Sequence, residues 1–110
     1  MSNSDEMLAC VEGDMDIFRD IVRVFLDVLP DSVASLREAI RNNDHTALFR
    51  EAHAIKGSTG VFGPSAALDT ALRLETLARE GNIPVAMREC AQLEADLDRL
   101  AGVLRQVAGV

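Results

Sequence analysis

Apolar residues recur every three or four positions along most of the chain, and this spacing is the feature that most constrains the fold. One side of the segment from Asp14 to Asn42 would carry Phe18, Ile21, Val22, Phe25, Leu29, Val33, Leu36 and Ile40. Strand-like alternation and the dipeptides typical of hairpins are missing. The pattern therefore predicts an all-α protein.

Proline and glycine positions divide this pattern into helices. Pro30 removes one backbone hydrogen bond in the first segment, which leaves either one kinked helix or two shorter ones, and we favour the kinked helix. Asp44 is a candidate N-cap for the next helix. The expected helices run over about Asp14 to Asn42, His45 to Phe62, Ser65 to Glu80 and Pro84 to Val107.

The connections between these helices are short, so consecutive helices should be antiparallel neighbours. We expect an up-and-down bundle of four helices, with a short extra helix at about Asp5 to Cys10 covering one end. A length of 110 residues without a linker or internal repeat predicts a single domain, 1–110, with its core at about 14–107.

Charge and composition narrow the classes of partner. The net charge is −7 and no run of lysine or arginine interrupts the acidic background, which argues against nucleic acid or an anionic membrane as a partner. No signal-like segment or membrane-length apolar stretch is present, so we expect a cytoplasmic domain without direct membrane contact. Cys10 and Cys90 fit no metal spacing and are interpreted as free thiols.

The stretch AHAIKGSTGVFG, Ala52 to Gly63, places a histidine beside several glycines in the second helix. A helical wheel puts Leu48, Ala52, Ile55, Thr59 and Phe62 on the core face. His53, Lys56, Gly57 and Gly60 follow the spacing i, i+3, i+4, i+7 and form a second stripe that faces solvent. Each helical glycine costs about 0.5–1 kcal/mol relative to alanine. The bare surface would let another macromolecule approach the imidazole closely.

Other uses of this histidine have weaker support. An isolated His-x-x-Lys is usually an ordinary surface pair. The glycines on the same stripe favour a functional histidine instead. No second ligand lies three or four residues from His53, so no metal site is expected. His45 is interpreted as solvated, and no strand–turn–helix context indicates an activated serine.

Glu75 lies on an otherwise apolar stripe of the third helix and therefore needs a partner. It either reaches back to His53, where it would fix the imidazole tautomer, or pairs with Arg79 at i, i+4 on the surface. The two interpretations are equally supported. A carboxylate at His53 would favour the protonated ring and the Lys56 cation would oppose it, and the balance between them stays open.

The same stretch resembles the signature of histidine-containing phosphotransfer (HPt) domains, an Ala-His-x-aliphatic-Lys-Gly core followed by small residues and a closing glycine. FLDVLPDSVASLREAIRNND and LRLETLAREGN are similar to the helices before and after it, and the likeness covers about Asp14 to Leu104. The resemblance implies a four-helix bundle that carries a phosphoryl group between aspartates of receiver domains.

The resemblance also implies a role for each site residue. His53 would be the phosphoacceptor, Lys56 would offset the phosphate charge, and Glu75 would orient the imidazole. Gly57 and Gly60 would give the receiver clearance, with Phe49 and Arg50 as further partner contacts. Phe49 departs from the family pattern, and it either docks the partner or covers the helix flank.

The family implies no cofactor, metal or ATP-dependent kinase activity of its own, since the receiver would supply Mg²⁺. The expected partners are receiver domains of response regulators and of a hybrid sensor kinase. The chain is either a separate protein or one domain of such a kinase. A monomer is expected. Two alternatives remain: an interaction module that is never phosphorylated, and the phosphorylated domain of a chemotaxis-type kinase, which the first helix and Glu75 suit less well.

Overall fold

The computed structural model describes residues 7–110, and all regular structure in this range is helical. A short 3₁₀ helix, η1 (Ala9–Val11), precedes α2 (Met15–Arg41), α3 (His45–Gly60), α4 (Ala66–Glu80) and α5 (Ile83–Ala108). The four long helices form a bundle, which confirms the predicted all-α fold.

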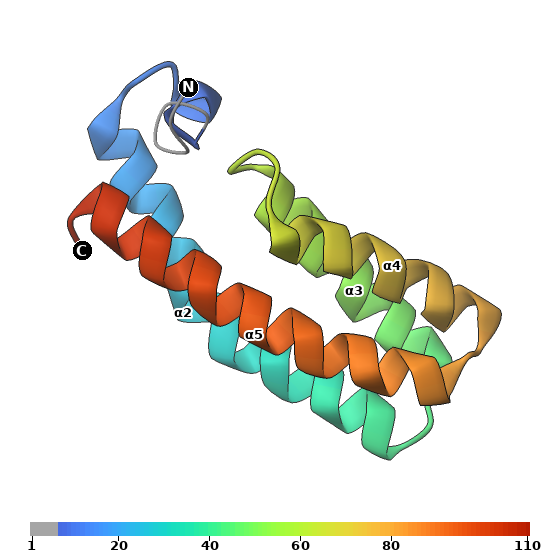
Figure 1. Cartoon of the computed structure of the whole chain (residues 1–110). Helices are drawn as coiled ribbons and strands as arrows, with labels where there is room; N and C mark the ends of the chain where they lie inside the picture. Colours follow the sequence, from blue (N-terminus) through green and yellow to red (C-terminus); the bar gives the residue numbers. More distant parts are fainter. Residues whose placement is uncertain (1–6) are drawn as a thin grey trace.

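Each helix packs against the helices before and after it in sequence, and α5 closes the ring by packing against α2. In Figure 1, α2 lies beside α5 and α3 lies beside α4, in the up-and-down order that the short connections predict. The 27 residues of α2 span about 40 Å at the usual helical rise. This length matches the longest dimension of the molecule, 41 Å.

The core is aliphatic with one aromatic cluster. Phe62 lies beyond the end of α3 and is still buried, because its ring packs edge-to-face against Phe25 and Phe18 of α2 at centroid distances of 5.3 and 6.1 Å. This cluster attaches the α3–α4 connection to α2. Cys90 is buried without a disulfide, and burial raises the pKa of its thiol to about 11, while the side chain of Cys10 lies outside the described part.

A buried polar contact joins α4 to α5. The Thr70 hydroxyl donates to Asp96 Oδ2 at 2.6 Å, and Gln92 Nε2 donates to Asp96 Oδ1 at 2.9 Å. A buried carboxylate without partners would be costly, so this contact favours one register of α4 along α5. The same register determines where Glu75 of α4 lies relative to α3.

Side-chain caps set the helix ends close to the predicted positions. Asp44, Ser65 and Asn82 each accept a hydrogen bond from the backbone N–H three residues later, at the starts of α3, α4 and α5. Gly81 ends α4 with a left-handed φ of 71°, a conformation that glycine adopts readily at the end of a helix. The expected end of the second helix at Phe62 was wrong: α3 stops at Gly60, and the next residues turn Phe62 into the core.

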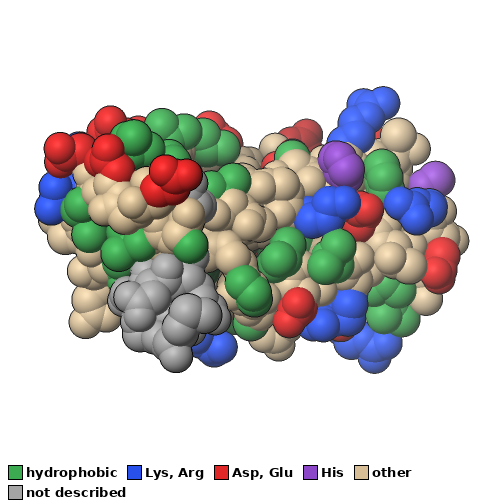
Figure 2. Space-filling model, turned by 90° about the horizontal axis from the view of Figure 1, so that it is seen from above, with side chains coloured by type: hydrophobic (Ala, Val, Ile, Leu, Met, Phe, Trp, Pro, Cys, Tyr) green, Lys and Arg blue, Asp and Glu red, His purple; other side chains and the backbone are tan. Residues whose placement is uncertain are grey.

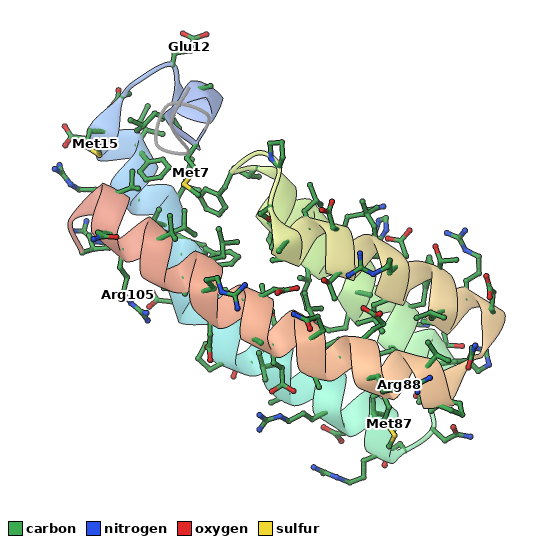
Figure 3. All side chains as sticks on the ribbon, in the orientation of Figure 1. Met7, Glu12, Met15, Met87, Arg88 and Arg105 are labelled. Carbon is green, nitrogen blue, oxygen red and sulfur yellow. The ribbon has the colours of Figure 1, made fainter. Side chains whose placement is uncertain are left out.

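The N-terminal segment covers one end of the bundle. The helix expected at Asp5 to Cys10 begins outside the described residues; within them Met7 and Leu8 are helical, and η1 follows directly. Met7 is buried, and Figure 3 shows its side chain pointing from this segment toward the helices. None of the helices between residues 7 and 110 has the length and apolar character needed to cross a membrane.

Helix α2 continues through Pro30, so the choice between one helix and two is resolved in favour of one. Proline has no N–H, and the Leu26 carbonyl therefore lacks its usual intrahelical donor. Pro30 itself is exposed, which leaves that carbonyl accessible to water.

Replacing this proline tests its energetic cost. Pro30→Ala restores the missing donor, and we expect the free energy of unfolding to rise by about 1–3 kcal/mol, after allowing for the greater freedom of the unfolded chain. Urea unfolding with an unchanged m-value measures this difference. Equal or lower stability in the variant would contradict the expectation.

Candidate functional site

The exposure of His53 follows from the core face of α3. Leu48, Ala52, Ile55 and Thr59 are all buried, as the helical wheel predicts. The buried Thr59 hydroxyl has a hydrogen-bond partner, because it donates to the Ile55 carbonyl at 2.8 Å. With that face against the core, the His53 side chain points outward and is 61% exposed.

Glu75 of α4 is the residue on which the site side chains converge. Its side chain is only 10% exposed, and Oε2 lies 3.1 Å from His53 Nδ1 and 3.0 Å from Lys56 Nζ. Oε1 lies 3.3 Å from Lys56 Nζ and 3.5 Å from Arg79 Nη2. Both interpretations that the sequence left open are therefore present together: Glu75 contacts His53 across the helices and Arg79 along its own helix.

The charge state of Glu75 determines the tautomer of His53. The hydrogen bond from Lys56 is the largest influence and lowers the pKa of the Glu75 carboxyl; burial raises it, the His53 contact lowers it, and the net shift is downward. An ionised carboxylate can only accept hydrogen bonds, so the proton in the His53 contact lies on Nδ1. Among residues 7–110, no side chain bonds Nε2, so that nitrogen carries a lone pair without a hydrogen-bond partner in the described part of the chain.

Gly57 and Gly60 leave the surface beside His53 bare. A Cβ on Gly57 would meet no atom within 4 Å, and one on Gly60 would meet only Leu68 Cδ1 at 3.9 Å. Packing inside the chain therefore does not require glycine at either position. Both glycines are helical and exposed, which keeps open the approach to the imidazole.

Phe49 contacts the histidine directly, in addition to the two roles that the sequence suggested for it. Its ring is half-buried and stacks on the His53 imidazole, with centroids 6.0 Å apart and planes 17° apart. The Arg79 guanidinium lies over the Phe49 ring, 5.2 Å from its centroid. Sequence reasoning considered Arg79 only as an intrahelical partner of Glu75, because the contact with Phe49 depends on how α3 and α4 are aligned.

Arg50 does not join this cluster. It is exposed one turn before His53, on the flank of α3 that faces α2, where it lines a surface hollow with Ser35 and Glu38. The structure thus brings together His53, Lys56, Glu75 and Phe49 and leaves Arg50 apart.

A family model of the Hpt domain matches residues 20–103, which is most of the chain and includes every residue of this cluster. The chain belongs to the Hpt domain family. Hpt domains act in histidine phosphotransfer within two-component phosphorelays. No curated protein and no solved structure matched the chain.

The charges of this Hpt domain are unevenly distributed. In Figure 2, the purple histidine side chains lie near most of the visible blue lysine and arginine side chains, and the largest group of red carboxylates lies at the opposite end of the face, with further carboxylates near the histidines. Lys56 and Arg79 both contact Glu75, so two cations and one carboxylate lie at His53 in a chain of net charge −7. Between residues 7 and 110, no group of three or more His, Cys, Asp or Glu side chains is arranged to hold a metal ion.

The pH dependence of stability tests the ionised state of Glu75. Because folding lowers the pKa of this carboxyl, its contribution is complete above the unfolded glutamate pKa of about 4.3 and is lost as the pH falls through the lower folded value. Glu75→Gln should reduce the free energy of unfolding by about 1 kcal/mol at pH 7, and this difference should shrink toward pH 3. Urea unfolding at both pH values measures it.

Glu80→Gln is the matched control, since Glu80 is exposed on the same helix. Its effect should stay within about 0.5 kcal/mol at either pH. A Glu75→Gln difference that is the same at both pH values would show that the carboxylate charge contributes nothing.

Proposed function

We propose that this Hpt domain is a phosphohistidine carrier in which His53 takes a phosphoryl group from an aspartyl phosphate of one receiver domain and returns it to an aspartate of another. The observation that carries the proposal is the imidazole itself: Nδ1 contacts a buried carboxylate, while the side chain as a whole is 61% exposed on the stripe that carries Gly57 and Gly60. A histidine nucleophile needs this combination of a fixed tautomer and an accessible second nitrogen.

The transfer step follows from that geometry. The lone pair of His53 Nε2 forms a bond to phosphorus as the bond between phosphorus and the aspartyl oxygen breaks, and the released electron pair stays on the receiver carboxylate. The Nδ1 proton remains on the ring, which becomes cationic, and the Glu75 carboxylate 3.1 Å away stabilises that charge. The reverse step delivers the phosphoryl group to the second receiver, so the carrier is regenerated unchanged.

Lys56 is the cation of α3 assigned to the phosphoryl oxygens. It lies one helical turn beyond His53, and its contacts with both Glu75 oxygens hold the ammonium group at the site. Mg²⁺ and most of the electrostatic stabilisation are assigned to the receiver in this proposal.

The receiver is proposed to dock over the glycine stripe and the neighbouring edge of α2. Val24 and Val28 of α2 are 64% and 52% exposed, and they line one surface hollow together with Val61. Exposed apolar side chains beside an open approach to the nucleophile are typical of a partner surface.

Histidine substitution combined with intact-mass measurement tests the proposed function. The protein is mixed with pre-phosphorylated receiver domains and Mg²⁺, and one added phosphate that is labile in acid and stable in base is expected. His53→Gln should remove this product with the fold intact. The chain has one other histidine, so His45→Gln is the matched control and should be phosphorylated normally.

Each other result rejects the proposal. A phosphate that persists in His53→Gln would assign the acceptor elsewhere. Absence of transfer with retained binding would identify an interaction module, and phosphorylation by an ATP-dependent kinase alone would indicate a kinase substrate domain.

The clearance role of Gly57 is tested by a pair of glycine substitutions. Gly57→Leu and Gly102→Leu both fill open space on an exposed helix, and each should raise the free energy of unfolding by about 0.5–1 kcal/mol. Only Gly57→Leu should weaken receiver binding, by about fivefold or more, because an overpacked contact costs about 1–3 kcal/mol. Urea unfolding and titration calorimetry measure the two effects, and equal receiver affinity for both variants would contradict the clearance role.

A further inference from the structure

We propose that Phe49 is a positioning residue for His53, and that Phe49, His53, Glu75 and Arg79 form a closed ring of contacts that fixes the plane of the imidazole. The inference rests on the proposed function, since it concerns the orientation of the same nucleophile. It replaces the expected role of Phe49 as a partner contact with a role inside the chain.

The contacts close on themselves across α3 and α4. Glu75 Oε2 lies 3.1 Å from His53 Nδ1, and the His53 ring stacks on Phe49 with centroids 6.0 Å apart. Arg79 closes the ring, because its guanidinium lies 5.2 Å from the Phe49 centroid and its Nη2 lies 3.5 Å from Glu75 Oε1. Each of the four side chains therefore contacts two others.

The ring of contacts restrains a motion that the hydrogen bond alone permits. A single bond at Nδ1 fixes the distance to Glu75, but the imidazole can still swing about the line that joins the two atoms. The His53 side chain is 61% exposed, so few other contacts oppose this motion. A nearly parallel aromatic face, 17° from the imidazole plane, opposes it directly and keeps Nε2 aimed in one direction.

The contact between Phe49 and His53 follows from their spacing along α3. Phe49 precedes His53 by four residues, so the two rings lie one above the other on the same helix face. Phe49 is half-buried against the core, and this packing holds its ring while the imidazole remains exposed. In-line attack depends on orientation, so a fixed imidazole shortens the search for a reactive geometry.

A small phosphoryl donor separates positioning from partner docking. Phosphoramidate transfers its phosphoryl group when His53 Nε2 bonds to phosphorus, the phosphorus–nitrogen bond of the donor breaks, and ammonia leaves after taking up a proton from water. No receiver surface takes part. Phe49→Leu should slow this reaction by about three- to tenfold, the range expected for loss of one aromatic pair. Phe49→Tyr keeps the ring and should restore the wild-type rate.

The orientation itself has a spectroscopic signature. In the wild type, the ring protons of His53 should be shifted upfield by the stacked aromatic face, and the Nδ1-protonated tautomer should dominate in imidazole nitrogen spectra. Phe49→Leu should lose the upfield shift and Phe49→Tyr should keep it. Arg79→Gln should give a rate between those of the wild type and Phe49→Leu, because it opens the ring of contacts at one position.

A stability control excludes a general loss of packing. Val107 is partly buried at the far end of α5, and Val107→Ala should lower stability without changing the phosphoramidate rate or the His53 shifts. Wild-type rates and shifts in Phe49→Leu would overturn the inference. Slowing that occurs only with receiver donors would make Phe49 a docking contact. A wild-type protein that phosphoramidate does not modify at His53 would count against the proposed function, while the His53 shifts would still decide whether Phe49 orients the ring.

Discussion

The site depends on one constraint, the burial of the Glu75 carboxylate between α3 and α4. A buried charge must be paired, and the side chains within reach are His53, Lys56 and Arg79. Pairing with His53 sets the tautomer, and pairing with Lys56 holds a cation one turn away from the imidazole. A single acidic residue on an apolar helix face thus organises groups from two helices, and the Thr70–Asp96 contact keeps that helix in register against α5.

The shared cation suits a group that must be both accepted and released. Lys56 contacts Glu75 through both carboxylate oxygens, so part of its charge is neutralised before any phosphoryl group arrives. A free, preorganised cluster of cations would hold a phosphoryl group tightly and would oppose its return to a receiver. In the proposed carrier, this arrangement would stabilise the phosphorylated state only moderately, which would keep the two transfer steps nearly balanced in free energy.

The sequence predicted the parts of this structure that depend on local pattern. Helical spacing and turn residues located the four helices, and the core face of α3 placed His53 toward solvent, because both follow from the geometry of a single helix. The partners of Glu75 stayed undecided, since that contact requires the alignment of α3 with α4. The Arg79–Phe49 contact was missed for the same reason, and the early end of α3 was missed because burial of Phe62 depends on the rings of α2.

The stripe of His53, Gly57 and Gly60 shows how function and stability are separated in this bundle. The large buried side chains lie on the inner faces of the helices, so the outer face of α3 contributes little to the core. Glycines there weaken the helix by an amount that the core can absorb, and they do so without creating a cavity or a strained backbone. The His53 side chain can therefore stay exposed on a rigid helix, as the proposed transfer requires, because the rigidity comes from the opposite face of the same helix and from the contacts with Glu75 and Phe49.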